Sequence, residues 1–261
     1  AKIGYPDRWR DYSKLEIRDD SLWDNMVRVA EFQDRFWLEK IGGPNDPSLW
    51  YMNAHEVNAY YDPSTNEICF PAGILQYPFF DMNADDAFNY GAIGSTIGHE
   101  MTHGFDDTGR KFDRDGNLRD WWTADDGARF DARANVLRKF FDNILVAPNT
   151  HANGEFTLGE NLADYGGVTI AFTAYQNFAT PAATDEHGMT GDMRFFVAYA
   201  GTEAGNIRDD AILLRTKTDE HSLSRWRVNG ILPHIDAWYD AFHITENDKL
   251  YVAPENRIKL W

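Results

Sequence analysis

The sequence predicts an α+β fold that is mainly α-helical and contains a small sheet. Several long segments carry apolar side chains at helical spacing, whereas one segment, residues 57–70, has β-branched and aromatic residues on both sides of a turn. Of the 261 residues, 43% are hydrophobic and 15% are aromatic, which is a globular composition. This length allows one large domain or two closely joined ones.

The first predicted helix covers residues 21–40. Its apolar side chains recur at helical spacing, and Ser21 is a candidate N-cap with Asp24 three residues further on. We therefore expect an amphipathic helix here.

A hairpin is predicted over residues 57–70, which read VNAYYDPSTNEICF. The letters DPSTN have the chemistry of a turn, and the residues on both sides favour strands. The edge of a sheet is therefore expected in this part of the chain.

A second helix is predicted over residues 86–103, although it contains Gly91, Gly94 and Gly98. Each glycine costs about 1 kcal/mol relative to alanine in an exposed helix, so something must offset the cost. The three lie on one face, where glycine would allow another backbone to approach closely. We therefore expect this helix to be deeply buried.

The remaining elements are further helices over residues 124–141, 158–178 and 193–200. The small and polar residues 180–192 are expected to form a surface loop, and residues 113–117 a turn.

Charge and cysteine content narrow the class of protein. The chain has 42 acidic and 25 basic residues and a formal net charge of −17, so it repels phosphate backbones and anionic headgroups. No apolar run approaches the roughly 20 residues that a membrane-spanning helix needs. A single cysteine, Cys69, excludes an intramolecular disulfide and is expected to act as a small buried apolar residue. Nucleic acids are thus not expected partners.

The string HEMTH, residues 99–103, carries the chemistry. On a helix His99 and His103 lie one turn apart on one side, so both imidazoles can bind one metal ion. Glu100 lies near the same side. Three protein ligands and a water form an open zinc site, in which a neighbouring carboxylate takes the proton of the water. The spacing therefore predicts metal-assisted hydrolysis.

A third ligand must come from elsewhere, because position 109, where one known pattern has a third histidine, is Gly109. In GENLADYGG, residues 159–167, Glu160 and Asp164 lie four residues apart on one helix face. A solvated helix face would also explain the pair, but the apolar residues around it favour burial. We assign Glu160 as the third ligand.

Carboxylates that hold the far side of the two imidazoles are expected as well, since a zinc-bound histidine usually donates its other N–H to such a group. Asp164 is the candidate for His99. For His103 it is Asp106 or Asp107, although a helix end followed by a solvated turn would explain these two residues equally.

Five blocks together resemble the neprilysin-type zinc metallopeptidases, peptidase family M13. In chain order the blocks are VNAYY, FPAGILQYPFF, HEMTHGFDD, GENLADYGG and KTDEHSLSRWRVNG. The resemblance extends from Lys2 to Trp261. It implies a thermolysin-like zincin (gluzincin) fold, one Zn²⁺ per chain and an endopeptidase or oligopeptidase that cleaves short peptides.

The resemblance also implies roles for the metal site. His99, His103 and Glu160 correspond to the zinc ligands, and Glu100 corresponds to the general base that activates water. Asp164 corresponds to the residue that orients His99.

Further roles concern the substrate. VNAYY is similar to the substrate-binding edge strand of the family, so the Asn58 amide, the Ala59 backbone and Tyr60 are expected to contact the peptide. His221 and Arg227 are similar to residues that bind the substrate carbonyl and stabilise its developing negative charge.

One departure from the family lies in AGTEAGNIR, residues 200–208. Thr202 and Glu203 stand where the family has an apolar residue followed by an aromatic one, at positions that line the primed side of the cleft. A carboxylate there would disfavour acidic side chains and favour basic or polar ones. A separate expectation is that Asp219 orients His221.

The resemblance further implies that residues 1–261 form the C-terminal catalytic domain of a longer type of chain. Relatives have a helical N-terminal region that closes over the cleft, so a cap from the same precursor, another chain or self-association is expected to cover apolar surface. An extracytoplasmic location is implied by the resemblance alone.

Two other interpretations remain open. One is a catalytically silent zincin that binds peptides or a partner chain. The other is a structural zinc protein, which is disfavoured because such sites normally have four protein ligands. The other histidines are expected to be ordinary core or surface residues: His55, His151, His187, His234 and His243.

Overall fold

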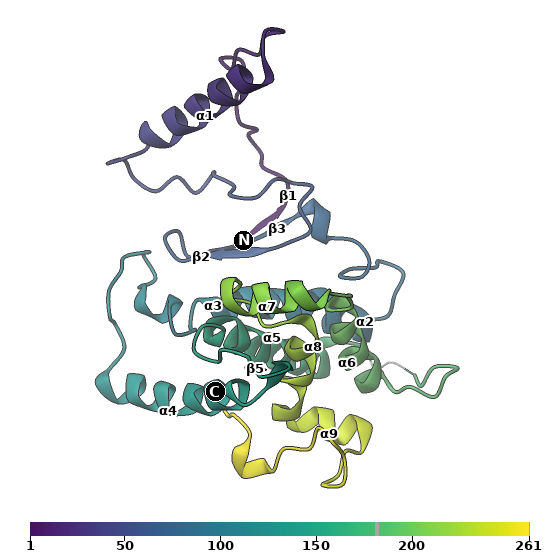
Figure 1. Ribbon diagram of the computed structural model, residues 1–261. Helices are drawn as coiled ribbons and strands as arrows, with labels where there is room; N and C mark the ends of the chain where they lie inside the picture. The colour runs from purple at the N-terminus through teal and green to yellow at the C-terminus, as the bar shows by residue number, and fades with distance from the viewer. Residues whose placement is uncertain (181–182, 261) are drawn as a thin grey trace.

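The computed structural model describes residues 1–180 and 183–260, which form a helical body on one side of a small sheet (Figure 1). The helix α1 stands apart, on the other side of the sheet. The helices are α1 (Leu22–Leu38), α2 (Asp86–Asn89), α3 (Ser95–His103), α4 (Ala124–Asp142), α5 (Leu158–Phe178), α6 (Gly191–Thr202), α7 (Asp209–Thr218), α8 (Ser224–Asn229) and α9 (Asp236–Phe242). The predicted class, α+β and mainly helical, is confirmed.

Two crossing helices, α3 and α5, form the centre of the body. A Cβ atom added to Gly98 of α3 would lie 2.7 Å from the carbonyl oxygen of Gly167 on α5, so only glycine allows this approach. At Gly91 the added atom would meet the backbone of Phe195 on α6. The predicted close contacts are therefore confirmed at these two glycines. At Gly94 the prediction is wrong, because the nearest atom lies at an ordinary contact distance of 3.4 Å.

The predicted helix over residues 86–103 is continuous but not uniform. A π-helical turn, Tyr90–Gly94, separates α2 from α3. This turn is buried at Gly91, Ala92 and Ile93. The expected burial is confirmed, since α3 buries both His99 and Glu100.

The sheet contains three strands in the order β1-β3-β2. They are β1 (Lys2–Gly4), β2 (Tyr60–Asp62) and β3 (Glu67–Pro71). β2 and β3 form the predicted antiparallel hairpin, with Tyr60 opposite Cys69, and β2 is an edge strand. β1 pairs in parallel with β3 and was not predicted. A separate antiparallel pair consists of β4 (Leu145–Ala147) and β5 (Thr150–His151).

Helix α1 forms as predicted, with the Ser21 hydroxyl accepting the Asp24 N–H at 3.3 Å. All of its residues keep some exposure, and Leu22 and Trp23 are 78% and 71% exposed. Apolar surface is thus open on this side of the molecule, away from the helical body (Figure 1).

The other predicted helices and the predicted turn are also confirmed. Helices α4, α5 and α6 match the expected ranges to within two residues at each end, and residues 113–117 form the expected turn. In the predicted loop, residues 183–190 are irregular and α6 already begins at Gly191; residues 181–182 lie outside the described chain. Helices α7, α8 and α9 were not predicted.

The main core lies among α4, α5, α6 and α9 and is rich in aromatic side chains. Cys69 is fully buried in the sheet, as expected. Within the described part of the chain, every helix is too short or too polar to cross a membrane.

Candidate active site

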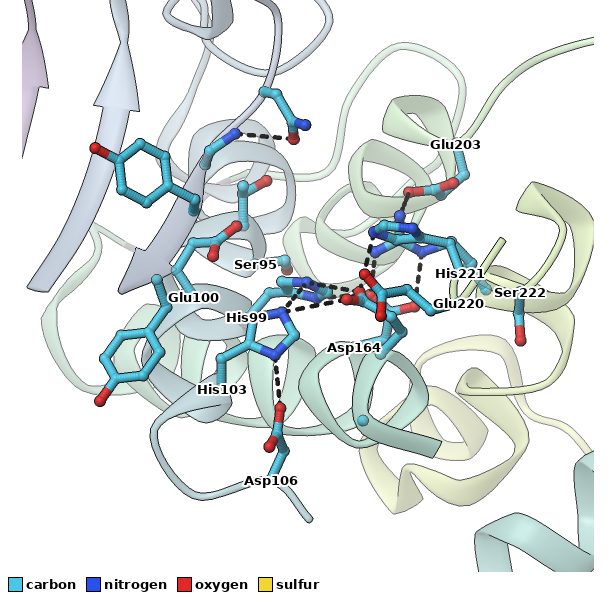
Figure 2. Close-up of a pocket in the computed structure, with 18 of the residues that line it drawn as sticks. Ser95, His99, Glu100, His103, Asp106, Asp164, Glu203, Glu220, His221 and Ser222 are labelled. Atoms are coloured by element: carbon cyan, nitrogen blue, oxygen red, sulfur yellow. Dashed lines mark hydrogen bonds and ion pairs between the residues drawn. The ribbon is translucent and has the colours of Figure 1, made fainter. Parts of the chain in front are cut away.

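The candidate site is a cavity of about 720 Å³ between the sheet edge and the helical body. Residues from β2, α3, α5 and the segment 199–227 line it. Its floor is the α3–α5 crossing, so the glycine contacts that bring these helices together also bring their polar side chains together (Figure 2).

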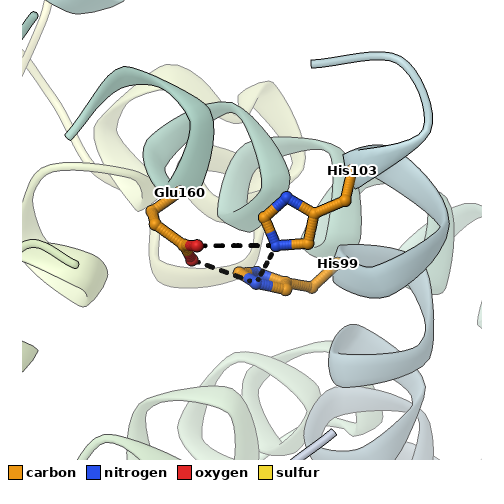
Figure 3. A group of neighbouring side chains, drawn as sticks. All are labelled: His99, His103 and Glu160. Atoms are coloured by element: carbon orange, nitrogen blue, oxygen red, sulfur yellow. Dashed lines mark hydrogen bonds and ion pairs between the residues drawn. The ribbon is translucent and has the colours of Figure 1, made fainter. Parts of the chain in front are cut away.

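Three side chains converge on one point (Figure 3). The Nε2 atoms of His99 and His103 lie 3.0 Å apart. Glu160 faces both of them, with Oε2 at 3.3 Å from His99 Nε2 and Oε1 at 3.6 Å from His103 Nε2. The structure therefore brings together the three residues that were expected to bind metal.

Carboxylates hold the other side of each imidazole. His99 Nδ1 lies 2.9 Å from Asp164 Oδ1, and His103 Nδ1 lies 2.8 Å from Asp106 Oδ2. A carboxylate accepts the Nδ1–H, so in the neutral tautomer each Nε2 carries a lone pair. Of the two candidates beside His103, the structure selects Asp106 and not Asp107.

This donor set fits a zinc ion. Two Nε2 lone pairs face each other beside a carboxylate, which is unfavourable unless a cation lies between them. Glu160 Oε2 is buried and has no hydrogen-bond partner among the described residues. Zinc–ligand distances of about 2.0–2.1 Å in a tetrahedron place ligand atoms roughly 3.3 Å apart, close to the observed spacing.

The charges around His99 show the same preference for a cation. Burial by itself lowers the pKa of His99, but Asp164 and Glu160 outweigh it and raise that pKa to about 10. In the absence of metal the site therefore attracts a proton instead.

Glu100 projects from α3 into the same cavity and is 5% exposed (Figure 2). Burial raises its pKa, while His99 and His103 oppose the shift. A carboxylate with a raised pKa is a better proton acceptor than an exposed one. The expected general base thus lines the same cavity as the three candidate metal ligands.

Arg227 on α8 binds Asp164 with two nitrogens, Nε at 2.8 Å and Nη2 at 2.6 Å. Its third nitrogen, Nη1, lies 3.4 Å from Oε1 of Glu203. The sequence predicted Arg227 as a substrate ligand and missed this pairing, because the two residues lie 63 positions apart. The arginine can still face a substrate through Nη1.

His221 also lies close to Glu160. Its Nε2 lies 3.2 Å from Glu160 Oε2, and its Nδ1 lies 2.9 Å from Asp219 Oδ1, the residue expected to orient it. Arg215 binds the other Asp219 oxygen at 2.7 Å. The sequence did not identify Arg215, although its spacing of four residues on a helix was a signal.

The expected substrate strand lies at the mouth of the cavity. Asn58, Ala59 and Tyr60 line it, and Asn58 Oδ1 accepts the Ala59 N–H at 2.9 Å. The Tyr60 hydroxyl accepts the Tyr51 N–H at 3.2 Å. Asn58 and Ala59 precede β2, so their backbone is not part of the sheet ladder.

Thr202 and Glu203 lie at the C-terminal end of α6 and line the same cavity. The Thr202 hydroxyl donates to the Tyr199 carbonyl at 2.7 Å. Ser95, which the sequence did not single out, also lines it and is 3% exposed.

The chain is similar in sequence and structure to known proteins. A family model described as peptidase family M13 matches residues 58–258. Neprilysin from Mus musculus is 36% identical over 274 residues, which cover 100% of this chain and 36% of that protein. Neutral endopeptidase from Lactococcus lactis subsp. cremoris is 36% identical over 261 residues, with 99% of this chain and 40% of that protein covered. The chain also superposes on the crystal structure of Mycobacterium tuberculosis zinc metalloprotease ZMP1 in complex with an inhibitor, with a TM-score of 0.95 and 45% sequence identity. This match covers 100% of this chain and 41% of that one.

Proposed function

Because the chain belongs to peptidase family M13, we propose that residues 1–261 form the catalytic domain of a zinc-dependent endopeptidase or oligopeptidase. The resemblance inferred from five sequence blocks is thereby confirmed. The chain spans only 36–41% of the length of the relatives compared, so the activity of the whole protein is part of the proposal. The observation that carries it is the His99, His103 and Glu160 cluster with Glu100 in the same cavity.

Zinc held by His99, His103 and Glu160 would supply a water of lowered pKa and would polarise the peptide carbonyl. The Glu100 carboxylate takes the proton of the attacking water while the oxygen of that water bonds to the carbonyl carbon. Asp164 and Asp106 keep the Nε2 atoms of the two histidines directed at the metal position.

Negative charge then develops on the carbonyl oxygen. Arg227 offers the N–H groups of Nη1, and His221, when both of its nitrogens carry protons, offers an Nε2–H held in place by Asp219. Donors in a site shielded from water stabilise such charge strongly. Glu100 finally passes its proton to the leaving nitrogen, and the C–N bond breaks.

The peptide would lie along the edge at β2, where Asn58 and Ala59 meet the cavity. An extended peptide can bind such an edge through its own backbone N–H and C=O groups. In this structure Asn58 Oδ1 accepts the Ala59 N–H. When a peptide binds, the Asn58 amide would turn away from Ala59 and toward the substrate.

Two further parts of the proposal concern the surroundings. The exposed apolar residues of α1 favour a cap from another region of a longer protein, another chain or self-association. We also propose an extracytoplasmic location, which rests on the similarity to neprilysin.

The experiment compares the zinc-loaded protein with its Glu100→Gln variant on a mixed peptide library. We expect about one zinc in both proteins and internal cleavage only in the unmodified one. Cleavage that survives Glu100→Gln would refute the assigned base. Peptide binding with zinc and without any cleavage would favour the catalytically silent zincin.

A further inference from the structure

A half-buried acid at the end of α6 is not used by the proposed reaction. Glu203 has a side chain that is 15% exposed and lines the cavity. Burial raises its pKa, whereas Arg227 opposes that shift. A carboxylate in such a place needs a compensating group.

Arg227 does not fully supply the compensation. Two of its nitrogens are bound to Asp164, and only Nη1 approaches Glu203, at 3.4 Å. One guanidinium therefore serves two carboxylates, and when both are ionised one negative charge remains on this trio. A cationic ligand group is the natural complement.

The lining of the whole cavity also carries a net negative charge. Its described lining residues include eight carboxylates and two guanidinium groups. A divalent ion between His99 and His103 would offset two of these charges, which leaves the cavity negative. Such a field attracts positively charged peptides and repels acidic ones.

Ser95 supplies an independent observation. It lies on the first turn of α3, one helical turn before His99, and its buried hydroxyl has no hydrogen-bond partner among the described residues. A hydroxyl oxygen can accept a hydrogen bond from an ammonium or guanidinium group. Ser95 and Glu203 both line the cavity that holds the candidate metal ligands (Figure 2).

We propose that Glu203 and Ser95 form a side-chain subsite that selects a basic residue, lysine or arginine, next to the scissile bond. The aliphatic part of that side chain would lie against Ile74 and Phe79, which line the same cavity, and its charge would lie against Glu203. This inference rests on the proposed function and adds a substrate class to it.

A binding measurement tests the subsite without requiring cleavage. Peptides carry either one lysine or one norleucine, which keeps the aliphatic chain and lacks the charge, at each position in turn. Their dissociation constants are measured by calorimetry on the zinc-loaded Glu100→Gln protein. At a single position we expect lysine to bind about tenfold tighter than norleucine.

Matched variants locate the source of the preference. Added to Glu100→Gln, the change Glu203→Gln should bring the lysine-to-norleucine ratio to within about twofold, and Ser95→Ala should lower it severalfold. Glu220→Gln removes the same charge from the exposed mouth of the cavity and should leave most of the ratio intact.

Several outcomes would overturn the proposal: no preference for lysine, a preference that survives Glu203→Gln, or an equal loss in Glu220→Gln. Failure of the proposed function would give a different experimental result. In that case peptides would bind with the lysine preference, but the protein with intact Glu100 would leave them uncleaved.

Discussion

Replacing Asp164 with asparagine should damage both the metal site and the fold. The side chain accepts His99 Nδ1–H at 2.9 Å and two Arg227 N–H groups at 2.8 and 2.6 Å, and its exposure is 3%. Breaking a buried ion pair by removing one charge costs about 3–5 kcal/mol. Since Glu203 still faces Arg227, we expect the lower end, about 3 kcal/mol.

Zinc affinity should fall in the same variant by about 10–100-fold, because His99 loses the carboxylate that fixes its orientation and increases its basicity. Urea denaturation of the metal-free protein measures the first effect, and competition with a chelator measures the second. The matched control is Asp131→Asn, which breaks an exposed pair with Arg110 and should cost about 0–1 kcal/mol. Equal losses of stability in the two variants, with unchanged zinc affinity, would contradict the assigned role of Asp164.

Three further changes have definite expected results. Asp106→Asn should lower zinc affinity about 10–100-fold, measured by chelator competition, because His103 loses its charged partner. Gly98→Ala should lower the midpoint of thermal unfolding by several degrees, since the new Cβ would lie 2.7 Å from the α5 backbone. His234 is buried, and burial first and Arg257 second lower its pKa to about 4. The unfolded state therefore takes up the proton first, and acidification from about pH 6.5 to 4 removes about 3 kcal/mol of stability through this group. His234→Gln should remove this component from denaturation curves recorded against pH.

For each of these three predictions, a control variant or a contradicting result can be named. Asp107→Asn changes the neighbouring acid that does not touch His103, so an equal loss of zinc there would contradict the assignment of Asp106. Gly201 on α6 has open space where a Cβ would stand, so Gly201→Ala should stabilise slightly; a similar loss at both glycines would argue against the close helix contact. An acid dependence that is identical with and without His234 would show that this histidine does not titrate as described.

The parts of the fold that were predictable are those encoded by local patterns. Residues 158–178 have helical spacing throughout, and α5 has these same bounds. The turn DPSTN likewise encodes its own hairpin. The strand β1 has only three residues, and each of them pairs with a β3 residue 67 positions further along the chain, so no local pattern could reveal the pairing. Helix α7 lacked a recognisable apolar stripe, and all of its residues keep some exposure.

The residues of the candidate site also fall into two groups: those that a local sequence pattern predicts and those that only tertiary contacts reveal. HEMTH places His99, Glu100 and His103 through helix geometry alone, and the apolar residues around Glu160 indicated its burial. The Arg227 contacts with Asp164 and Glu203 join side chains from α8, α5 and the end of α6, and sequence spacing does not encode this arrangement. The unpartnered Ser95 hydroxyl likewise follows from tertiary packing and not from a local sequence pattern.

The proposed zinc site is tested most directly by anomalous diffraction at the zinc edge from crystals grown with zinc. We expect one peak per chain, within about 2.0–2.2 Å of the Nε2 atoms of His99 and His103 and of a Glu160 oxygen. A peak elsewhere, or a fourth protein ligand that closes the coordination shell, would contradict a catalytic zinc site in this cavity.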